Sequence, residues 1–339
     1  ASYSWAVIGG GYGNTANGNF STVNGGSSNL GSSTWATVGG GGSNAASGVA
    51  STVGGGYVNF ARGDYTVVSG GGGGSSADSN SATGSNSTIG GGRANVASGT
   101  YATVAGGSAN RASGGYSATV SGGASNIASG QDATVCGGYT NTASGNVSTV
   151  CGGTFNVAAG AYSFAAGRRA KANYDGCFRW ADSYNADFSI PDTANSFSVR
   201  ATGGVHLFTN ATLTSGAHLY AGSSTWNAVS DSTLKRRYGK VDTKEVLDKV
   251  ATLPIERWSY KAQDESVHHI GPMAQDFWRL FRVGDDSLSI LTIDPDGIAL
   301  AAIQELAKRN EKLEEQVARL TEQVQTLMAA EQHTSHKEK

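Results

Sequence analysis

A valine or isoleucine followed two residues later by glycine recurs through the first half of the chain. The recurring positions are Val7, Val23, Val38, Val53, Val68, Ile89, Val104, Val120, Val135 and Val150, and Ala165 continues the phase in degenerate form. The spacing is 15 residues, with two steps of 16 and one of 21 that spans a glycine-rich run after Val68. Such a fixed period indicates a repeat architecture.

Each unit carries a short Ala-Thr-Val run, and most units also have an Asn, an Ala and a Gly six, eight and ten residues after the Val. The pattern predicts a mainly β fold, a parallel β-roll or β-solenoid with two short strands per turn. The Val side chains would point inward and the Thr side chains outward. Glycine and asparagine would turn the corners, and equivalent Asn residues would stack. Eleven turns give a rod of about 50 Å.

Only one Val and one Ala per turn are available for the core, so we expect several chains packed around a common axis. The repeat over residues 1–170 resembles the β-roll heads of trimeric autotransporter adhesins. Collagen requires glycine at every third position, and calcium-binding nonapeptide repeats require aspartate. Neither pattern is present. The Thr column leaves an ice-binding face as a minor alternative.

Residues 171–229 contain aromatic, alternating runs such as Phe178–Ala181 and Val205–Phe208, which predict a β-rich collar closing the solenoid. His206 and His218 look isolated and are assigned structural roles. No metal site or cofactor is expected. Cys136 and Cys151 lie one repeat apart, and the sequence leaves open whether they pair.

Charge divides the chain at about residue 230. Residues 1–229 hold 8 Lys/Arg and 7 Asp/Glu, whereas residues 230–339 hold 16 and 19, so two folds are expected. The net charge of −2 argues against nucleic-acid or membrane binding. No apolar run is long enough for a membrane span. The repeat is in phase from the first residues, which suggests a fragment of a longer protein.

Residues 230–297 predict an α+β module. Asp242 caps a helix that stops before Pro254, Ile255–Tyr260 alternates like a strand, Pro272 opens a second helix, and 294–297 is a turn. Residues 298–330 predict a coiled coil, followed by a disordered tail at 331–339. The heptad core positions of the coiled coil are Ile303, Leu306, Asn310, Leu313, Val317, Leu320, Val324 and Leu327. These residues alone leave dimer and trimer open.

The module resembles the intramolecular chaperone, auto-processing domain at the C-termini of phage tail spikes and fibres such as endosialidases. The resemblance lies in Ser230-Asp-x-x-Leu-Lys235, in Leu-Pro-Ile-x-x-Trp-x-Tyr at 253–260, in His269-Ile-Gly-Pro-Met-Ala-Gln275 and in the terminal coiled coil. It implies a homotrimer that cuts itself once at the Val229–Ser230 bond. Ser230 would be the nucleophile, Lys235 the general base and His269 a helper.

A lysine acts as a base only when neutral, which requires burial or a cationic neighbour. Ser230 and Lys235 are five residues apart and do not share a helix face, so a turn, a strand or another subunit must bring them together. The alternative is that Ser230 and Asp231 merely cap a helix.

The sequence therefore predicts an extracellular trimeric fibre, on a virion tail or bacterial surface, with a host-surface or glycan ligand. It would be a single-turnover serine peptidase without an external substrate. The alternative is an uncleaved adhesin that keeps its C-terminal module as a permanent trimer clamp. A glycan-degrading spike is disfavoured, because the repeat lacks paired carboxylates.

Overall fold

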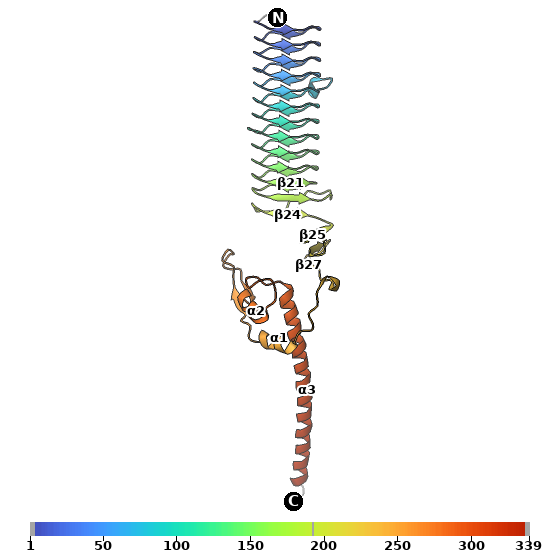
Figure 1. Cartoon of the computed structure of the whole chain (residues 1–339), viewed down its shortest axis with the longest axis vertical. Helices are drawn as coiled ribbons and strands as arrows, with labels where there is room; N and C mark the ends of the chain where they lie inside the picture. Colours follow the sequence, from blue (N-terminus) through green and yellow to red (C-terminus); the bar gives the residue numbers. More distant parts are fainter. Residues whose placement is uncertain (1–3, 192, 336–339) are drawn as a thin grey trace. The chain divides into compact units, whose positions relative to one another are not determined.

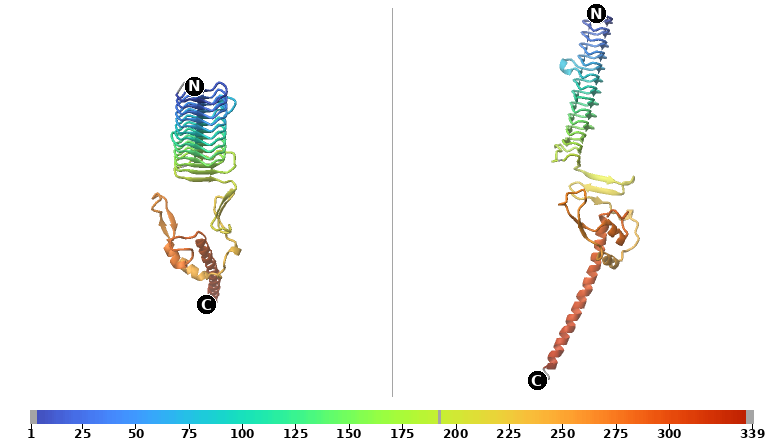
Figure 2. Two further views of the ribbon diagram at one scale, coloured as in Figure 1. Left: turned by 45° about the horizontal axis from the view of Figure 1, so that its top comes forward. Right: turned by 90° about the vertical axis from the view of Figure 1, so that its left-hand side faces the viewer.

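The computed structural model describes residues 4–191 and 193–335. It divides into two compact units, Ala1–Val229 and Ser230–Lys339. Most of the first unit is a stack of short parallel strands in two sheets (Figures 1 and 2). The mainly β class and the solenoid predicted from the repeat are confirmed.

The larger sheet has 13 strands. They are β1 (Val7–Ile8), β3 (Thr22–Val23), β5 (Thr37–Val38), β7 (Thr52–Val53), β9 (Val67–Val68), β11 (Thr88–Ile89), β13 (Thr103–Val104), β15 (Thr119–Val120), β17 (Thr134–Val135), β19 (Thr149–Val150), β21 (Phe164–Gly167), β23 (Phe178–Ala181) and β24 (Phe197–Arg200). From β3 to β19 the recurring Val or Ile at the second strand position is fully buried, and the Thr before it, where present, is partly exposed, as expected. The register corrects the first repeat, because Ile8 rather than Val7 pairs with Val23.

The second sheet has 11 strands, and each of them except the last begins at the residue after the recurring Asn. They are β2 (Thr15–Ala16), β4 (Leu30–Gly31), β6 (Ala45–Ala46), β8 (Phe60–Ala61), β10 (Ser81–Ala82), β12 (Val96–Ala97), β14 (Arg111–Ala112), β16 (Ile127–Ala128), β18 (Thr142–Ala143), β20 (Val157–Ala158) and β22 (Lys171–Ala172). The inserted residues after β9 form a 3-10 turn, η1 (Ser76–Asp78). The insertion leaves the stacking intact, because β9 still pairs with β11.

The stacked Asn side chains tie each turn to the next. Asn110, fully buried, donates from Nδ2 to the carbonyls of Gly106 and Gly123, both at 2.8 Å. Its Oδ1 accepts the backbone N–H of Asn126 at 3.0 Å. The sequence predicted amides bonded to one another, but in most turns each amide bonds backbone groups instead. The ladder thereby supplies hydrogen-bond partners to backbone groups at the corners between the two-residue strands.

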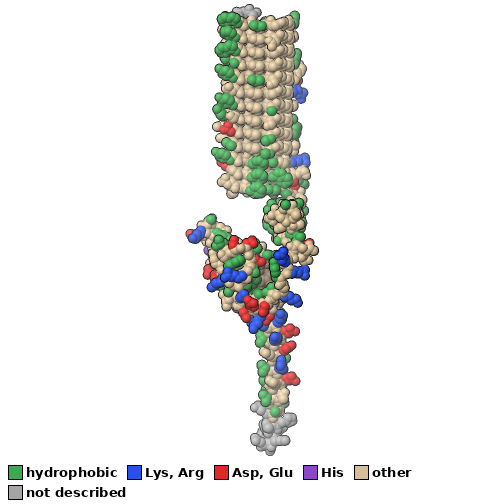
Figure 3. All heavy atoms as spheres, in the orientation of Figure 1, with side chains coloured by type: hydrophobic (Ala, Val, Ile, Leu, Met, Phe, Trp, Pro, Cys, Tyr) green, Lys and Arg blue, Asp and Glu red, His purple; other side chains and the backbone are tan. Residues whose placement is uncertain are grey.

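One corner of the stack is formed by residues with left-handed backbone conformation that are not glycine. Trp5, Phe20, Trp35, Tyr65 and Tyr101 occupy it with φ between 55° and 60°. Their rings are exposed, and Trp5 stacks on Phe20 with centroids 4.9 Å apart. Figure 3 shows hydrophobic side chains along one edge of the stack and few charged ones. Sequence reasoning missed this column because left-handed conformation favours Gly and Asn.

The stack continues past the predicted boundary at residue 170. β21, β23 and β24 pair in parallel, with Phe164, Phe178 and Phe197 stacked 4.7 and 4.8 Å apart. The expected collar is therefore wrong for 171–200. Phe stands here at the strand position that Thr occupies in the preceding turns, so the sequence period is no longer visible, although the strands still pair in parallel.

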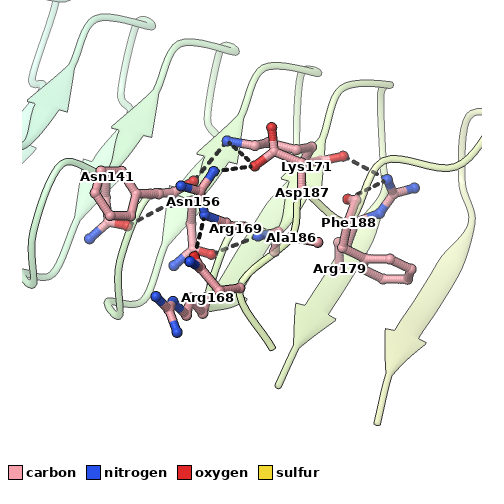
Figure 4. Close-up of polar contacts among 12 residues, drawn as sticks. Asn141, Asn156, Arg168, Arg169, Lys171, Arg179, Ala186, Asp187 and Phe188 are labelled. Carbon is pink, nitrogen blue, oxygen red and sulfur yellow. Dashed lines mark hydrogen bonds and ion pairs between the residues drawn. The ribbon is translucent and has the colours of Figure 1, made fainter. Parts of the chain in front are cut away.

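Charged groups gather where the Asn ladder ends (Figure 4). Asn156 Oδ1 accepts the backbone N–H of Ala170, and beyond it Arg169 Nη1 lies 2.9 Å from Asp187 Oδ1. Arg179, 1% exposed, fills a core position and donates to the carbonyl of Lys171 at 2.8 Å. This polar end differs from the Val-lined interior of the preceding turns.

A separate antiparallel sheet follows, of β25 (Gly204–Phe208), β26 (Gly216–Tyr220) and β27 (Asn227–Ala228). It corresponds to the C-terminal part of the predicted collar. His206 and His218, which the sequence treated as isolated, stand directly opposite one another in β25 and β26.

Over residues 230–335 the second unit holds three α-helices and a hairpin: α1 (Thr243–Val250), β28 (Glu256–Trp258), β29 (His269–Gly271), α2 (Ala274–Phe281) and α3 (Ile293–Ser335). Asp242 caps α1 through the N–H groups of Lys244 and Glu245, as predicted. Val246, Leu247 and Ala302 form a small core between α1 and α3. Arg309 of α3 pairs with Asp248 of α1 at 3.0 Å.

The turn predicted at 294–297 is wrong, because α3 already begins at Ile293 and Pro295 lies in its first turn, where proline is tolerated. The helix extends through Ser335, so it includes residues assigned to the disordered tail. Residues 336–339 of that tail lie outside the described part of the chain.

Candidate functional site

A 3-10 turn, η2 (Ser232–Leu234), lies between Ser230 and Lys235. The turn reverses the chain over a few residues, so that the Lys235 side chain folds back. Its Nζ donates to Ser230 Oγ at 2.5 Å. The two residues predicted as nucleophile and base therefore meet within one chain, and the turn takes the role that the five-residue spacing required.

Asp231 holds this turn in place. Its carboxylate accepts the backbone N–H and the hydroxyl of Thr233, both at 2.8 Å. These two hydrogen bonds, from the Thr233 backbone first and its hydroxyl second, lower the pKa of Asp231. Asp231 thus caps η2, not a longer helix, while Ser230 is left free to bond Lys235. Sequence reasoning named Asp231 only as a helix cap and missed its positioning role.

Both members of the Ser230–Lys235 pair are exposed to solvent in a single chain. Water solvates an ammonium group well, which disfavours the neutral amine that a base must supply. In a single chain Lys235 and Ser230 are therefore hydrogen-bonded but not shielded from water.

His269 lies in the β28–β29 hairpin. Its Nε2 bonds to Gln263 Oε1 at 2.9 Å, and its ring packs 4.7 Å from that of Trp258. No contact of His269 described in this chain involves Ser230 or Lys235. Its role as a helper in cleavage stays a prediction that nothing within one chain supports.

The hairpin and the start of α2 line a pocket that includes Trp258, Tyr260, Pro272 and Gln275. These residues come from the two sequence segments that carried the family resemblance. Their proximity indicates that these segments form one structural unit, in which Gln275 belongs to the pocket lining and not to the Ser230 turn.

The heptad positions of α3 form an apolar stripe without a partner in one chain. Ile303, Leu306, Leu313, Val317, Leu320, Val324 and Leu327 are each 53–67% exposed. Such a continuous stripe on a long helix is typical of a coiled-coil seam. Asn310, in the same series, bonds to Glu314 at 2.9 Å.

Within residues 4–191 and 193–335, no three or more His, Cys, Asp or Glu side chains gather as a metal cluster. None of the helices in this part of the chain has a stretch apolar and long enough to cross a membrane. Cys136 and Cys151 are free thiols, and burial together with the neighbouring Cys136 raises the pKa of Cys151.

Comparison with known proteins identifies the segment that carries the Ser230 turn, α1, the hairpin and α2. No curated protein matches the chain. Residues 230–283 match the model of peptidase family S74, a family of self-cleaving intramolecular chaperones described as chaperone of endosialidase.

Proposed function

We propose that the chain is one subunit of a homotrimeric fibre of the tail-fibre or surface-adhesin type, extracellular in location. Its C-terminal unit would align three chains and then detach by cleavage before Ser230. The observation that carries the proposal is the Lys235–Ser230 hydrogen bond at the start of the segment that matches the chaperone family. The two compact units also divide at Val229–Ser230, so a cut there would separate them without breaking either.

The proposed reaction uses groups that are already adjacent. Lys235 Nζ, when neutral, takes the proton of Ser230 Oγ, which attacks the carbonyl carbon of Val229. The peptide bond breaks, the amino group of Ser230 accepts the proton, and an ester joins Val229 to Ser230 Oγ. Water then hydrolyses this ester, which leaves a carboxylate on Val229 and restores the hydroxyl.

Trimer formation would supply the missing desolvation. The exposed stripe of α3 favours association of several chains, since apolar burial at each heptad contributes about 1.5–3 kcal/mol per side chain. Packing of neighbouring subunits over the Ser230 turn would remove water from Lys235 and favour its neutral form. Cleavage would then wait for assembly.

The solenoid explains why such a device is useful. Every turn offers nearly the same two-residue strands and the same Asn ladder, so a shift by one turn preserves most contacts between chains. A C-terminal clamp fixes the register before the shaft forms. Its removal leaves a shaft that cannot easily retrace its folding path.

The denatured mass of freshly made protein tests the proposal. We expect wild type to give pieces of 229 and 110 residues, while Ser230→Ala and Lys235→Met stay whole. Ser232→Ala, in the same turn, is the matched control and should be cut like wild type. Cleavage of Ser230→Ala at the same bond would refute the assigned nucleophile.

The second candidate is the uncleaved adhesin, favoured by the solvent exposure of the Ser230–Lys235 pair. It predicts that all four proteins stay whole while sedimentation equilibrium gives a trimeric native mass. A monomeric native mass would contradict both candidates. The ligand of either fibre would be a host-surface molecule or glycan.

A further inference from the structure

Two histidines face each other on the small antiparallel sheet of the first unit. His206 of β25 and His218 of β26 are directly paired, and their Nδ1 atoms lie 2.5 Å apart. The two imidazoles share the proton of one Nδ1–H group, so one ring donates and the other accepts. Nothing in the proposed assembly or cleavage uses this pair.

The register explains the close approach. Thr209 N–H donates to the carbonyl of Ser215, which makes 209 and 215 a hydrogen-bonded pair. Such pairs alternate with non-hydrogen-bonded ones along antiparallel strands, and His206–His218 falls on a non-hydrogen-bonded position. Side chains are closest at these positions. The strand backbone thus fixes both rings on one face of the sheet.

Packing also restricts the rings. His218 stacks on Tyr220 with centroids 5.7 Å apart, and the His206 ring lies 6.4 Å from that of Phe208 in a stacked arrangement. The two imidazoles meet edge to face, with centroids 4.8 Å apart and an interplanar angle of 63°. Their aromatic neighbours restrict the rings, which reduces the rotamer entropy lost when both bind one ion.

We propose that His206 and His218 form a chelating site for a divalent transition-metal ion of the imidazole-preferring class, Zn²⁺, Cu²⁺ or Ni²⁺. Zinc–nitrogen bonds of about 2.1 Å in tetrahedral geometry place two ligand nitrogens roughly 3.4 Å apart. Small rotations of the exposed rings supply the difference from 2.5 Å. The ring that donates from Nδ1 in the hydrogen bond transfers this proton through solvent to its own Nε2, while the other ring already carries its hydrogen there. Both neutral imidazoles then bind the ion through Nδ1, and water occupies the other positions.

A third side chain extends the row. Asn227 of β27 stands opposite His218, so its side chain lies on the same face. Its amide nitrogen is directed to the carbonyl of Thr225 at 3.3 Å, which leaves the amide oxygen as a neutral ligand candidate beside the two imidazoles. The site would cross-link β25 and β26. β26 in turn pairs with β27, the strand that directly precedes Val229.

Calorimetric titration of the full-length chain with Zn²⁺ tests the site. We expect one ion per chain, bound about 100-fold more weakly after His206→Gln or His218→Gln, because each change removes one arm of the chelate. His268→Gln changes a histidine that contacts Ser259 and has no histidine partner in its described contacts. This control should bind like wild type.

Electron paramagnetic resonance of the Cu²⁺-loaded wild type gives a readout that does not depend on the variants. Coupling to two imidazole nitrogens is expected, and coupling to one in either single variant. Identical Zn²⁺ titrations of wild type and of the double variant, in which both His206 and His218 are changed to Gln, would overturn the proposal. A wild-type Cu²⁺ spectrum that shows coupling to only one imidazole nitrogen would do the same. The contact would then be a hydrogen bond between the rings only.

Discussion

The Asn ladder makes a quantitative prediction at Asn110, in the middle of the stack. Asn110→Ala removes two donors and one acceptor at once, which leaves the carbonyls of Gly106 and Gly123 and the N–H of Asn126 without these partners. All three bonds involve a fully buried side chain. The carbonyl of Gly123 still accepts the backbone N–H of Ser108 at 3.0 Å, so two groups lose their only described partner. At about 1–2 kcal/mol for each of them, the free energy of unfolding should fall by about 2–4 kcal/mol.

Asn14→Ala is the matched control, because Asn14 makes the same three kinds of bond at the first turn of the ladder. It donates to Gly10 and Gly26 and accepts from Asn29, but its surroundings are more exposed. Water can replace the lost partners there, so we expect a loss below about 1 kcal/mol.

Guanidinium unfolding followed by far-ultraviolet circular dichroism measures both variants. Amide hydrogen exchange at the turns that flank Asn110 provides a local check, and protection should fall by roughly 100-fold or more. Equal effects of the two substitutions, or a loss below 1 kcal/mol for Asn110→Ala, would refute the view that the buried amides hold the turns together.

Two further predictions concern backbone conformation and acid stability. Gly107→Ala should destabilise the chain by about 3 kcal/mol or more, because its φ is +93° and an added Cβ would lie 2.2 Å from the carbonyl oxygen of Gly123. Gly106→Ala is the control, because there is open space around it, and it should cost less than about 1 kcal/mol. Similar unfolding midpoints for the two variants would contradict this reasoning. Hydrogen bonds from Thr202, and then Arg200 and Tyr184, lower the pKa of Asp182 far below its usual value. Its stabilisation is therefore complete above the unfolded value of about 3.9 and is lost as pH falls below it toward the lowered value. Thermal unfolding at pH 6 and at pH 2.5 should show a larger loss for wild type than for Asp182→Asn, and parallel losses would refute the assignment.

The sequence determined the repeat and its consequences. A fixed period with Val inward, Thr outward and Asn at the corners permits few folds, because equivalent residues of successive turns must stack on one another. The heptads of α3 and the cap at Asp242 are equally local signals, and the structure follows them. The same reasoning failed where local signals conflict with stacking: Phe164, Phe178 and Phe197 ended the visible period, yet parallel pairing carried the stack to Arg200.

Tertiary structure decided what depends on long-range register or on conformations that residue type does not favour. The aromatic corner uses left-handed backbone at Trp and Tyr, which stacking stabilises and single-residue preferences do not predict. His206 and His218 are separated by 12 residues and meet only because the hairpin register pairs them. The Ser230–Lys235 pair was named from its sequence context, but its closure within one chain depends on the turn that Asp231 caps, since a spacing of five residues does not by itself bring two side chains together.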